Sequence, residues 1–167
     1  PNVGTTNVTI PTTGQVGVMM YTAWQLNQIS GTAPTIRLTN KNNNDPMSIT
    51  LTFLPNKSSD ALTEKQQIET VKTIAAQYVA SSIEQKTSLR RLKTAIGDAL
   101  LANFNDAKYQ NSPTPKGEYS SVTIGLISHK KFSVSITILT NGIETNGHND
   151  ALDVLASLLL VARTDTP

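Results

Sequence analysis

The sequence predicts an α+β fold, in which an antiparallel β-sheet of hairpins is covered by two amphipathic helices. Apolar and polar residues alternate along 49–53 and 132–138, a pattern typical of strands with one buried face. Apolar residues recur at helical spacing along 68–79 and 151–162. The strands follow one another in hairpins rather than alternating with helices, and this order favours an antiparallel sheet over a parallel one.

The chain of 167 residues has the length of a single domain, and no internal repeat or long linker divides it. We therefore expect one α+β domain over 1–167. Residues 1–15 are rich in Thr, Asn, Gly and Pro, and only Val8 and Ile10 alternate there. We expect 1–15 and 163–167 to be flexible tails, the first with at most a short strand.

The first strands are predicted by period-two alternation along 16–20 and 24–26. A hairpin follows, in which 36–39 and 49–53 alternate on either side of 40–46. That connection is dominated by asparagine, and Asn and Asp tolerate left-handed backbone and bond to their own chain. It is therefore expected to be a turn.

The first helix is predicted to begin at Thr63. Thr63 and Gln66 have the spacing of a reciprocal capping box, and Glu64 lies in the first turn, where the helix dipole favours an acid. We expect the helix to continue to about Gln85. Its apolar stripe consists of Ile68, Val71, Ile74, Ala75, Tyr78 and Val79.

The second half of the chain predicts a hairpin and a closing helix. Residues 122–126 and 132–138 alternate on either side of a short connection at 129–131, which favours an antiparallel pair. Asn149 is the expected N-cap of the helix, because its side chain can accept from a free backbone N–H. Apolar residues over 151–162 would form the buried face of that helix.

The segment 89–104 admits two interpretations. Leu89, Leu92 and Ile96 fit a helical stripe, whereas Gly97 inside a helix costs about 1 kcal/mol relative to Ala. A bulged strand pair around Gly97 is the alternative.

The composition excludes several classes of chemistry. The chain has no cysteine, so disulfides, thiolate metal ligands and cysteine nucleophiles are excluded. Its net charge of +2 is too small to indicate a nucleic-acid partner. No hydrophobic run reaches the roughly 18–20 residues that span a bilayer, so we expect no transmembrane segment. With 23 Thr and 14 Asn the composition resembles that of secreted or periplasmic proteins, and removal of a signal peptide would explain a start at Pro1.

No catalytic motif is present in the sequence. The nucleophile elbow G-x-S-x-G and the glycine patterns that hold nucleotide phosphates are both absent, and we expect no cofactor. His129 lies in a turn beside two lysines, which favours a solvated side chain over a general acid or base.

His148, Asp150 and Asp153 suggest one alternative, a metal-dependent hydrolase. Zinc takes three or four protein ligands, and these residues would supply three at most. A helix start at Asn149 accounts for both aspartates without a metal, because acids are favoured in a first turn. We therefore expect no metal there.

Arg90, Arg91 and Lys93 form the main basic cluster of the sequence. Such a cluster can bind an anionic ligand or an acidic partner. The commoner interpretation is a solvated face opposite the apolar Leu89 and Leu92.

The order of the predicted elements carries a family resemblance. They are a strand pair with a tryptophan, a hairpin, a long helix, a glycine-containing apolar segment, a long hairpin and a closing helix (Trp24, 49–53, Thr63, 95–97, 119–140 and 151–160). This order, over 8–162, resembles the PsbP-like fold, which includes the DcrB-type bacterial envelope proteins. The resemblance implies that 89–104 belongs to the sheet, so we favour strands there. The chain lacks a lipidation cysteine, so we do not expect a DcrB-like membrane anchor.

The resemblance also implies an exported domain that binds or supports other proteins and that has no catalytic residues. The sequence therefore predicts a non-enzymatic secreted or periplasmic accessory domain whose partner is another protein. Exposed strand edges would also allow it to form oligomers. The metal-dependent hydrolase and the anionic-ligand binder remain the alternatives.

Overall fold

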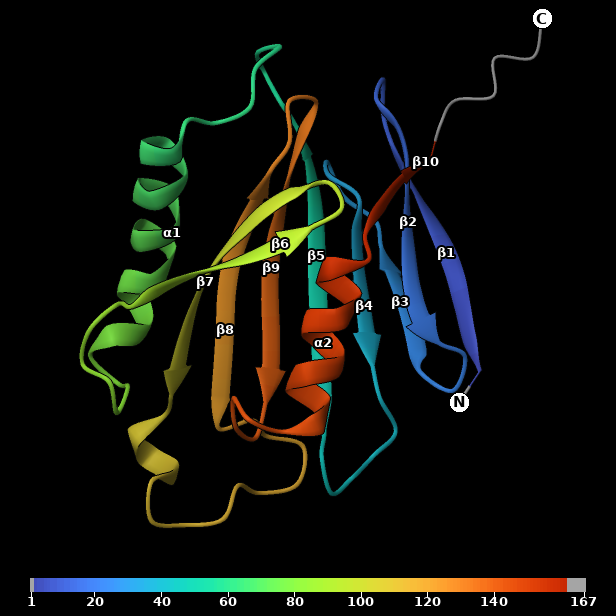
Figure 1. The fold of residues 1–167 in the computed structure, drawn as a ribbon. Coiled ribbons are helices and arrows are strands. Elements are labelled where there is room, and N and C mark those ends of the chain that lie inside the picture. The colour runs from blue at the N-terminus through green and yellow to red at the C-terminus, as the bar shows by residue number, and fades with distance from the viewer. Residues whose placement is uncertain (1, 162–167) are drawn as a thin grey trace, which may run out of the picture.

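A computed structural model of the chain describes residues 2–161, which form two antiparallel sheets, two α-helices and one 3₁₀ turn. The larger sheet has seven strands in the order β3-β4-β5-β9-β8-β7-β6, and the smaller has three in the order β1-β2-β10 (Figure 1). The strands are β1 (Val3–Ile10), β2 (Gly14–Tyr21), β3 (Gln25–Ile29), β4 (Thr35–Thr39), β5 (Met47–Pro55), β6 (Leu89–Thr94), β7 (Gly97–Asn105), β8 (Ser121–Ser128), β9 (Phe132–Thr140) and β10 (Leu159–Val161); the helices are α1 (Glu64–Val79), α2 (Asn146–Ala156) and the 3₁₀ turn η1 (Ala107–Tyr109). The fold is thus α+β with antiparallel sheets, as the sequence predicts.

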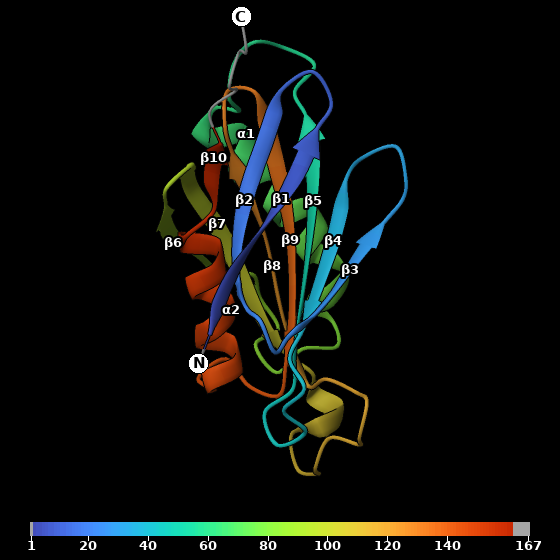
Figure 2. The ribbon, with the colours of Figure 1, turned by 90° about the vertical axis from the view of Figure 1, so that its right-hand side faces the viewer.

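The seven-stranded sheet has a hydrophobic cluster on each face. Alternate residues of β7 separate the two: Leu101 belongs to one cluster, and its neighbours Leu100 and Ala102 belong to the other. Helix α1 packs on the second face, over β7 and β8, whereas α2 and the three-stranded sheet lie on the first (Figures 1 and 2). The alternation of β7 and β8 therefore places buried apolar side chains on both faces of the sheet, whereas that of β5 and β9 places them on the first face.

The larger cluster lies between the two sheets. Phe53 of β5 and Phe132 of β9 are fully buried in it, together with aliphatic residues of both strands. Much of this face is covered by the small sheet, whose Val8, Ile10, Val16 and Val18 join the cluster. The sequence predicts two helices as the cover, and it does not predict the second sheet that lies over much of this face.

The N-terminal residues differ from the prediction. We expected a flexible tail over 1–15, but β1 pairs with β2 along its whole length, from Val3 opposite Tyr21 to Ile10 opposite Gly14. The reason is burial, because the alternating Val8 and Ile10 place their side chains in the core. The other predicted tail, 163–167, lies outside the described residues.

The capping box that opens α1 is confirmed. The Thr63 hydroxyl accepts from the Gln66 N–H, and the Gln66 side chain accepts from the Thr63 N–H. The helix ends at Val79 rather than near Gln85. The Ser82 hydroxyl donates to the Val79 carbonyl, and Ser82 then forms a bridge with Asp106 beside β7.

The segment 89–104 forms strands, β6 and β7, as the resemblance implies. They meet in a tight turn that ends at Gly97, whose φ of +135° is a conformation that favours glycine. A Cβ at this position would also lie 3.0 Å from the Ser128 carbonyl oxygen. The glycine that argues against a helix is therefore required by the turn.

The closing helix begins earlier and ends earlier than predicted. Its N-cap is Thr145, whose hydroxyl accepts from the His148 N–H, and not Asn149. The helix stops at Ala156, and Leu159–Val161 form β10 on the edge of β2. Residues 159–161, which we expected to extend the helix, pair instead with the edge of β2.

None of the helices described between residues 2 and 161 is both long enough and apolar enough to cross a bilayer.

Candidate functional site

An open groove lies between α2 and the end of β2. Strand β10 pairs with β2 only at residues 15–17, so that 18–21 have β1 on one side and α2 on the other. Helix α2 contacts β2 on the side away from β1 (Figure 1). The groove has a volume of about 190 Å³ and is lined by Val3, Met19, Met20, Tyr21, Trp24, Asp150, Asp153, Val154 and Ser157.

Two aromatic rings stand at right angles in this groove. Tyr21 ends β2, and the Trp24 N–H donates to the Tyr21 carbonyl in the turn that follows, at 3.0 Å. The ring centroids are 5.0 Å apart and the planes meet at 88°, an edge-to-face contact. The short turn thus fixes both rings as one corner of the groove.

The groove also collects exposed apolar side chains. Val3 is 52% exposed and Met19 is 44% exposed, although both belong to regular strands. Met19 follows the buried Val18, so the pleat of β2 turns it away from the core. Removing apolar side chains from water is favourable. Their clustering in one groove therefore indicates a surface that can bind another molecule.

Two carboxylates lie on the helix side of the groove. Asp150 and Asp153 are three residues apart on α2, which places them on one face of the helix. Burial raises the pKa of Asp150, and the nearby Asp153 and Asp45 carboxylates raise it further. None of the residues described as lining the groove is basic, so these acids face no internal counter-ion.

Asp45 ties the first turn of α2 to the large sheet. Its Oδ2 accepts from the Gly147 N–H at 2.7 Å, and a Cβ on Gly147 would lie 2.9 Å from Asp45 Oδ1. Glycine at 147 therefore permits a close approach of the helix to the loop before β5. This contact fixes the helix that carries Asp150.

His148 is separated from the two aspartates. Its ring is buried, and Nε2 lies 3.0 Å from the Thr123 hydroxyl on β8, which itself donates to Asn103 Oδ1. Because the Thr123 proton is used in that bond, Nε2 of His148 must be the donor to Thr123. Burial lowers the pKa of His148, and the charge of Arg90 lowers it further.

The structure therefore does not bring His148, Asp150 and Asp153 together as metal ligands. His148 bonds to the sheet, whereas both aspartates line the groove on the other side of the helix turn. Over residues 2–161 no group of three His, Asp or Glu side chains is arranged to hold a metal ion.

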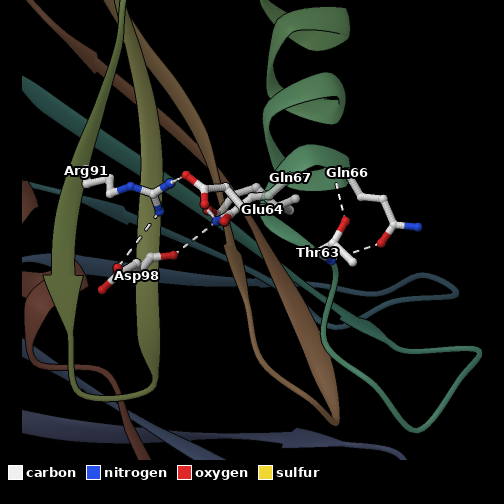
Figure 3. A network of polar contacts seen from close by, with 7 residues as sticks. Thr63, Glu64, Gln66, Gln67, Arg91 and Asp98 are labelled. Atoms are coloured by element: carbon white, nitrogen blue, oxygen red, sulfur yellow. Dashed lines mark hydrogen bonds and ion pairs between the residues drawn. The ribbon is translucent and has the colours of Figure 1, made fainter.

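The basic cluster is divided between the two faces of β6. Arg91 lies opposite Leu100, on the α1 side, and forms ion pairs with Glu64 and Asp98 (Figure 3). Arg90 lies opposite Leu101, on the α2 side. Lys93 lies two residues after Arg91 and therefore on the same, α1 side, because side chains alternate between the faces of a strand. The three charges that adjoin in sequence do not form one surface.

Figure 3 also shows how α1 is joined to the sheet beside Arg91. The buried Gln67 donates through Nε2 to the Asp98 carbonyl at 3.0 Å and to the Leu126 carbonyl at 2.9 Å. The ion pair of Arg91 with Glu64 is exposed, and such pairs contribute between zero and about 1 kcal/mol. The region thus has a structural role, in joining α1 to β7 and β8.

His129 remains in the β8–β9 turn, where its ring stacks on Phe132 and Nδ1 accepts from the Lys131 N–H. Partial burial lowers the pKa of His129, and the charges of Lys130 and Lys131 lower it further.

Sequence reasoning missed the groove. Trp24 was recognisable as the single tryptophan of an aromatic-poor chain, and two methionines precede it closely. Nothing local indicates that Met19 and Trp24 face Asp150, because more than a hundred residues separate them along the chain.

Comparison of the chain with protein-family models, curated proteins and solved structures finds no match.

Proposed function

We propose that the chain is a non-enzymatic binding domain that holds a partner protein in the groove between β2 and α2. The observation that carries the proposal is the gathering of Val3, Met19, Tyr21 and Trp24 at one open surface. Aromatic residues and methionine are enriched at the centres of protein interfaces, where they supply most of the binding energy.

The non-catalytic part of the proposal is supported by the polar groups of the groove. Asp150 and Asp153 are its titratable side chains apart from Tyr21, and no nucleophile–base pair is formed among the residues described there. The ring of His148 is bonded to Thr123 within the core, and that of His129 lies in a distant turn. A general base needs a position within hydrogen-bond reach of a substrate proton, which neither ring has at the groove.

The proposal includes the place of action. The Thr- and Asn-rich composition supports an exported protein, periplasmic or secreted. We extend the proposal to kinship with the PsbP-like, DcrB-type envelope proteins, which the order of hairpins and helices supports. An accessory role beside another protein is the function this kinship implies.

The test is a protein-observed NMR titration with a panel of short peptides. Each peptide presents one aliphatic or aromatic residue, and the panel contains basic, neutral and acidic members. We expect the bound peptides to shift the amide signals of Met19, Trp24 and Val154 most strongly. A panel in which no member binds, or in which all shifts fall on other surfaces, refutes the proposed function.

A further inference from the structure

We infer that the groove between β2 and α2 recognises a lysine or arginine side chain of the partner polypeptide. The inference rests on the proposed function and names the chemistry that the groove selects. The observation that carries it is the position of two carboxylates without an ion-pair partner beside two aromatic rings and several apolar side chains in one groove.

The carboxylates supply the charge that a basic side chain needs. Asp150 and Asp153 lie on the same side of α2, and within 2–161 neither forms an ion pair. The ion pairs of the described residues use Glu64, Asp98 and Glu118 instead. Like charges that share a site disfavour one another, so a bound cation relieves a repulsion that the free protein carries.

The aromatic corner supplies a second attraction for the same ligand. A guanidinium or ammonium group is attracted to the face of Trp or Tyr when it lies within about 6 Å of the ring centroid. Tyr21 and Trp24 meet at 88°, and a cationic group that lies over the open face of either ring gains this attraction. Tryptophan is the strongest partner for this interaction among the aromatic residues.

The apolar lining fits the rest of the side chain. Lysine and arginine carry three or four methylene groups, which pack along apolar surfaces while the charged end stays near water. Met19, Val154 and the exposed Val3 provide such a surface beside the acids. An open groove of about 190 Å³ admits one long side chain and leaves its end accessible to solvent.

Other occupants fit the groove less well. An acidic segment would be repelled by Asp150 and Asp153. A purely apolar segment would desolvate both carboxylates with no compensating charge. A second copy of this chain would have to present one of its own basic side chains, so self-association is an outcome that the test must distinguish.

The experiment compares four peptides that differ at one residue, lysine, arginine, norleucine or glutamate, in an otherwise uncharged host with a leucine beside it. Dissociation constants are measured by NMR titration at low and at moderate salt. We expect the lysine and arginine peptides to bind at least about tenfold more tightly than the norleucine peptide, and the difference to shrink with salt. The glutamate peptide is expected to bind weakest.

Variants of the chain identify the groups responsible. Asp150→Asn combined with Asp153→Asn keeps the shape of the groove, and we expect it to reduce the preference for lysine over norleucine to less than about threefold. The matched control is Asp60→Asn combined with Glu69→Gln, two exposed acids elsewhere in the chain, which should preserve the preference. Trp24→Leu is expected to weaken binding of both basic peptides.

Each outcome separates the two proposals. Equal binding of norleucine and lysine peptides at the groove overturns the cation inference and leaves the proposed function standing. Binding of no peptide overturns the proposed function as well. If sedimentation shows a dimer that the Asp150→Asn, Asp153→Asn variant dissociates, the occupant is a second copy and the inference of a separate partner is wrong.

Discussion

Lowering the pH below 6.5 is expected to destabilise the fold through His148. The ring is fully buried, Nε2 donates to Thr123, and Nδ1 has no hydrogen-bond partner among the described residues. Protonation would place a charge at Nδ1 in the core, in the first turn of α2, where the helix dipole also disfavours a cation. Arg90 adds a like charge nearby.

The sign of the effect follows from the direction of the pKa shift. The pKa of His148 in the folded chain is lowered from 6.5 by burial and by Arg90, so the unfolded chain binds a proton first as the pH falls. Stability is therefore full above the unfolded pKa. It declines from about pH 6.5 down to the folded pKa, with a limiting slope of about 1.4 kcal/mol per pH unit.

Urea unfolding at pH 7.5, 6.5 and 5.5 measures this slope. His148→Gln is the informative variant, because its side-chain amide can still donate to Thr123 but does not titrate. We expect the wild type to lose stability between pH 6.5 and 5.5 and the variant to lose distinctly less. His129→Gln measures the contribution of the other histidine, whose pKa is also lowered, so that the two contributions to the slope can be separated. Equal slopes for the wild type and His148→Gln would refute the reasoning.

Three further predictions concern packing and charge. Gly125→Ala should lower the free energy of unfolding, measured in urea, by at least about 2 kcal/mol, because the added Cβ would overlap the Leu100 carbonyl oxygen. Unchanged stability would contradict the close approach of β8 to β7 at this position. Phe53→Ala should cost about 3–5 kcal/mol in the same assay, whereas the exposed Leu54→Ala should change little; equal effects would contradict the assigned faces of β5. Asp150→Asn should stabilise the chain at pH 7, since the raised pKa shows that the folded state disfavours the ionised carboxyl. The gain should vanish as the pH falls through the folded pKa toward 3.8, and a loss of thermal stability at pH 7 would contradict it.

The parts of the fold that local rules determine could be predicted from the sequence. Thr63 and Gln66 satisfy each other's backbone within one turn, so the start of α1 needs no tertiary information. Period-two alternation likewise placed β5 and β9, because one face of each strand is apolar. The segment 89–104 could be assigned to strands rather than a helix only with the help of the resemblance.

Long-range contacts decided the elements that sequence reasoning missed. Thr145 and Asn149 are both good N-caps, and the contact of the Gly147 N–H with Asp45, about a hundred residues away in sequence, favours the earlier start. Strand β10 forms because the edge of β2 is free at Gly17. The polar N-terminal stretch forms a strand because Val8 and Ile10 are buried in the larger cluster, where β1 contacts β5.

The candidate site depended on the same long-range contacts. The groove exists because β2 and α2 come together, so that Trp24 and Asp150 line one surface. The residues that sequence adjacency had grouped, Arg90 and Arg91, are separated by the alternation of β6. Charged residues that adjoin in sequence thus lie on opposite faces of one strand, whereas the residues of the groove come from segments that are distant in sequence.

The most direct test of a cation-recognising groove is the pKa of the Asp150 carboxyl, measured by ¹³C NMR with and without a bound peptide. A lysine peptide should lower this pKa, because an ammonium group beside the carboxylate stabilises its ionised form. A norleucine peptide should leave it raised or raise it further by desolvation. If the lysine peptide binds at the groove and the pKa of Asp150 does not fall, the proposed recognition of a basic side chain is contradicted.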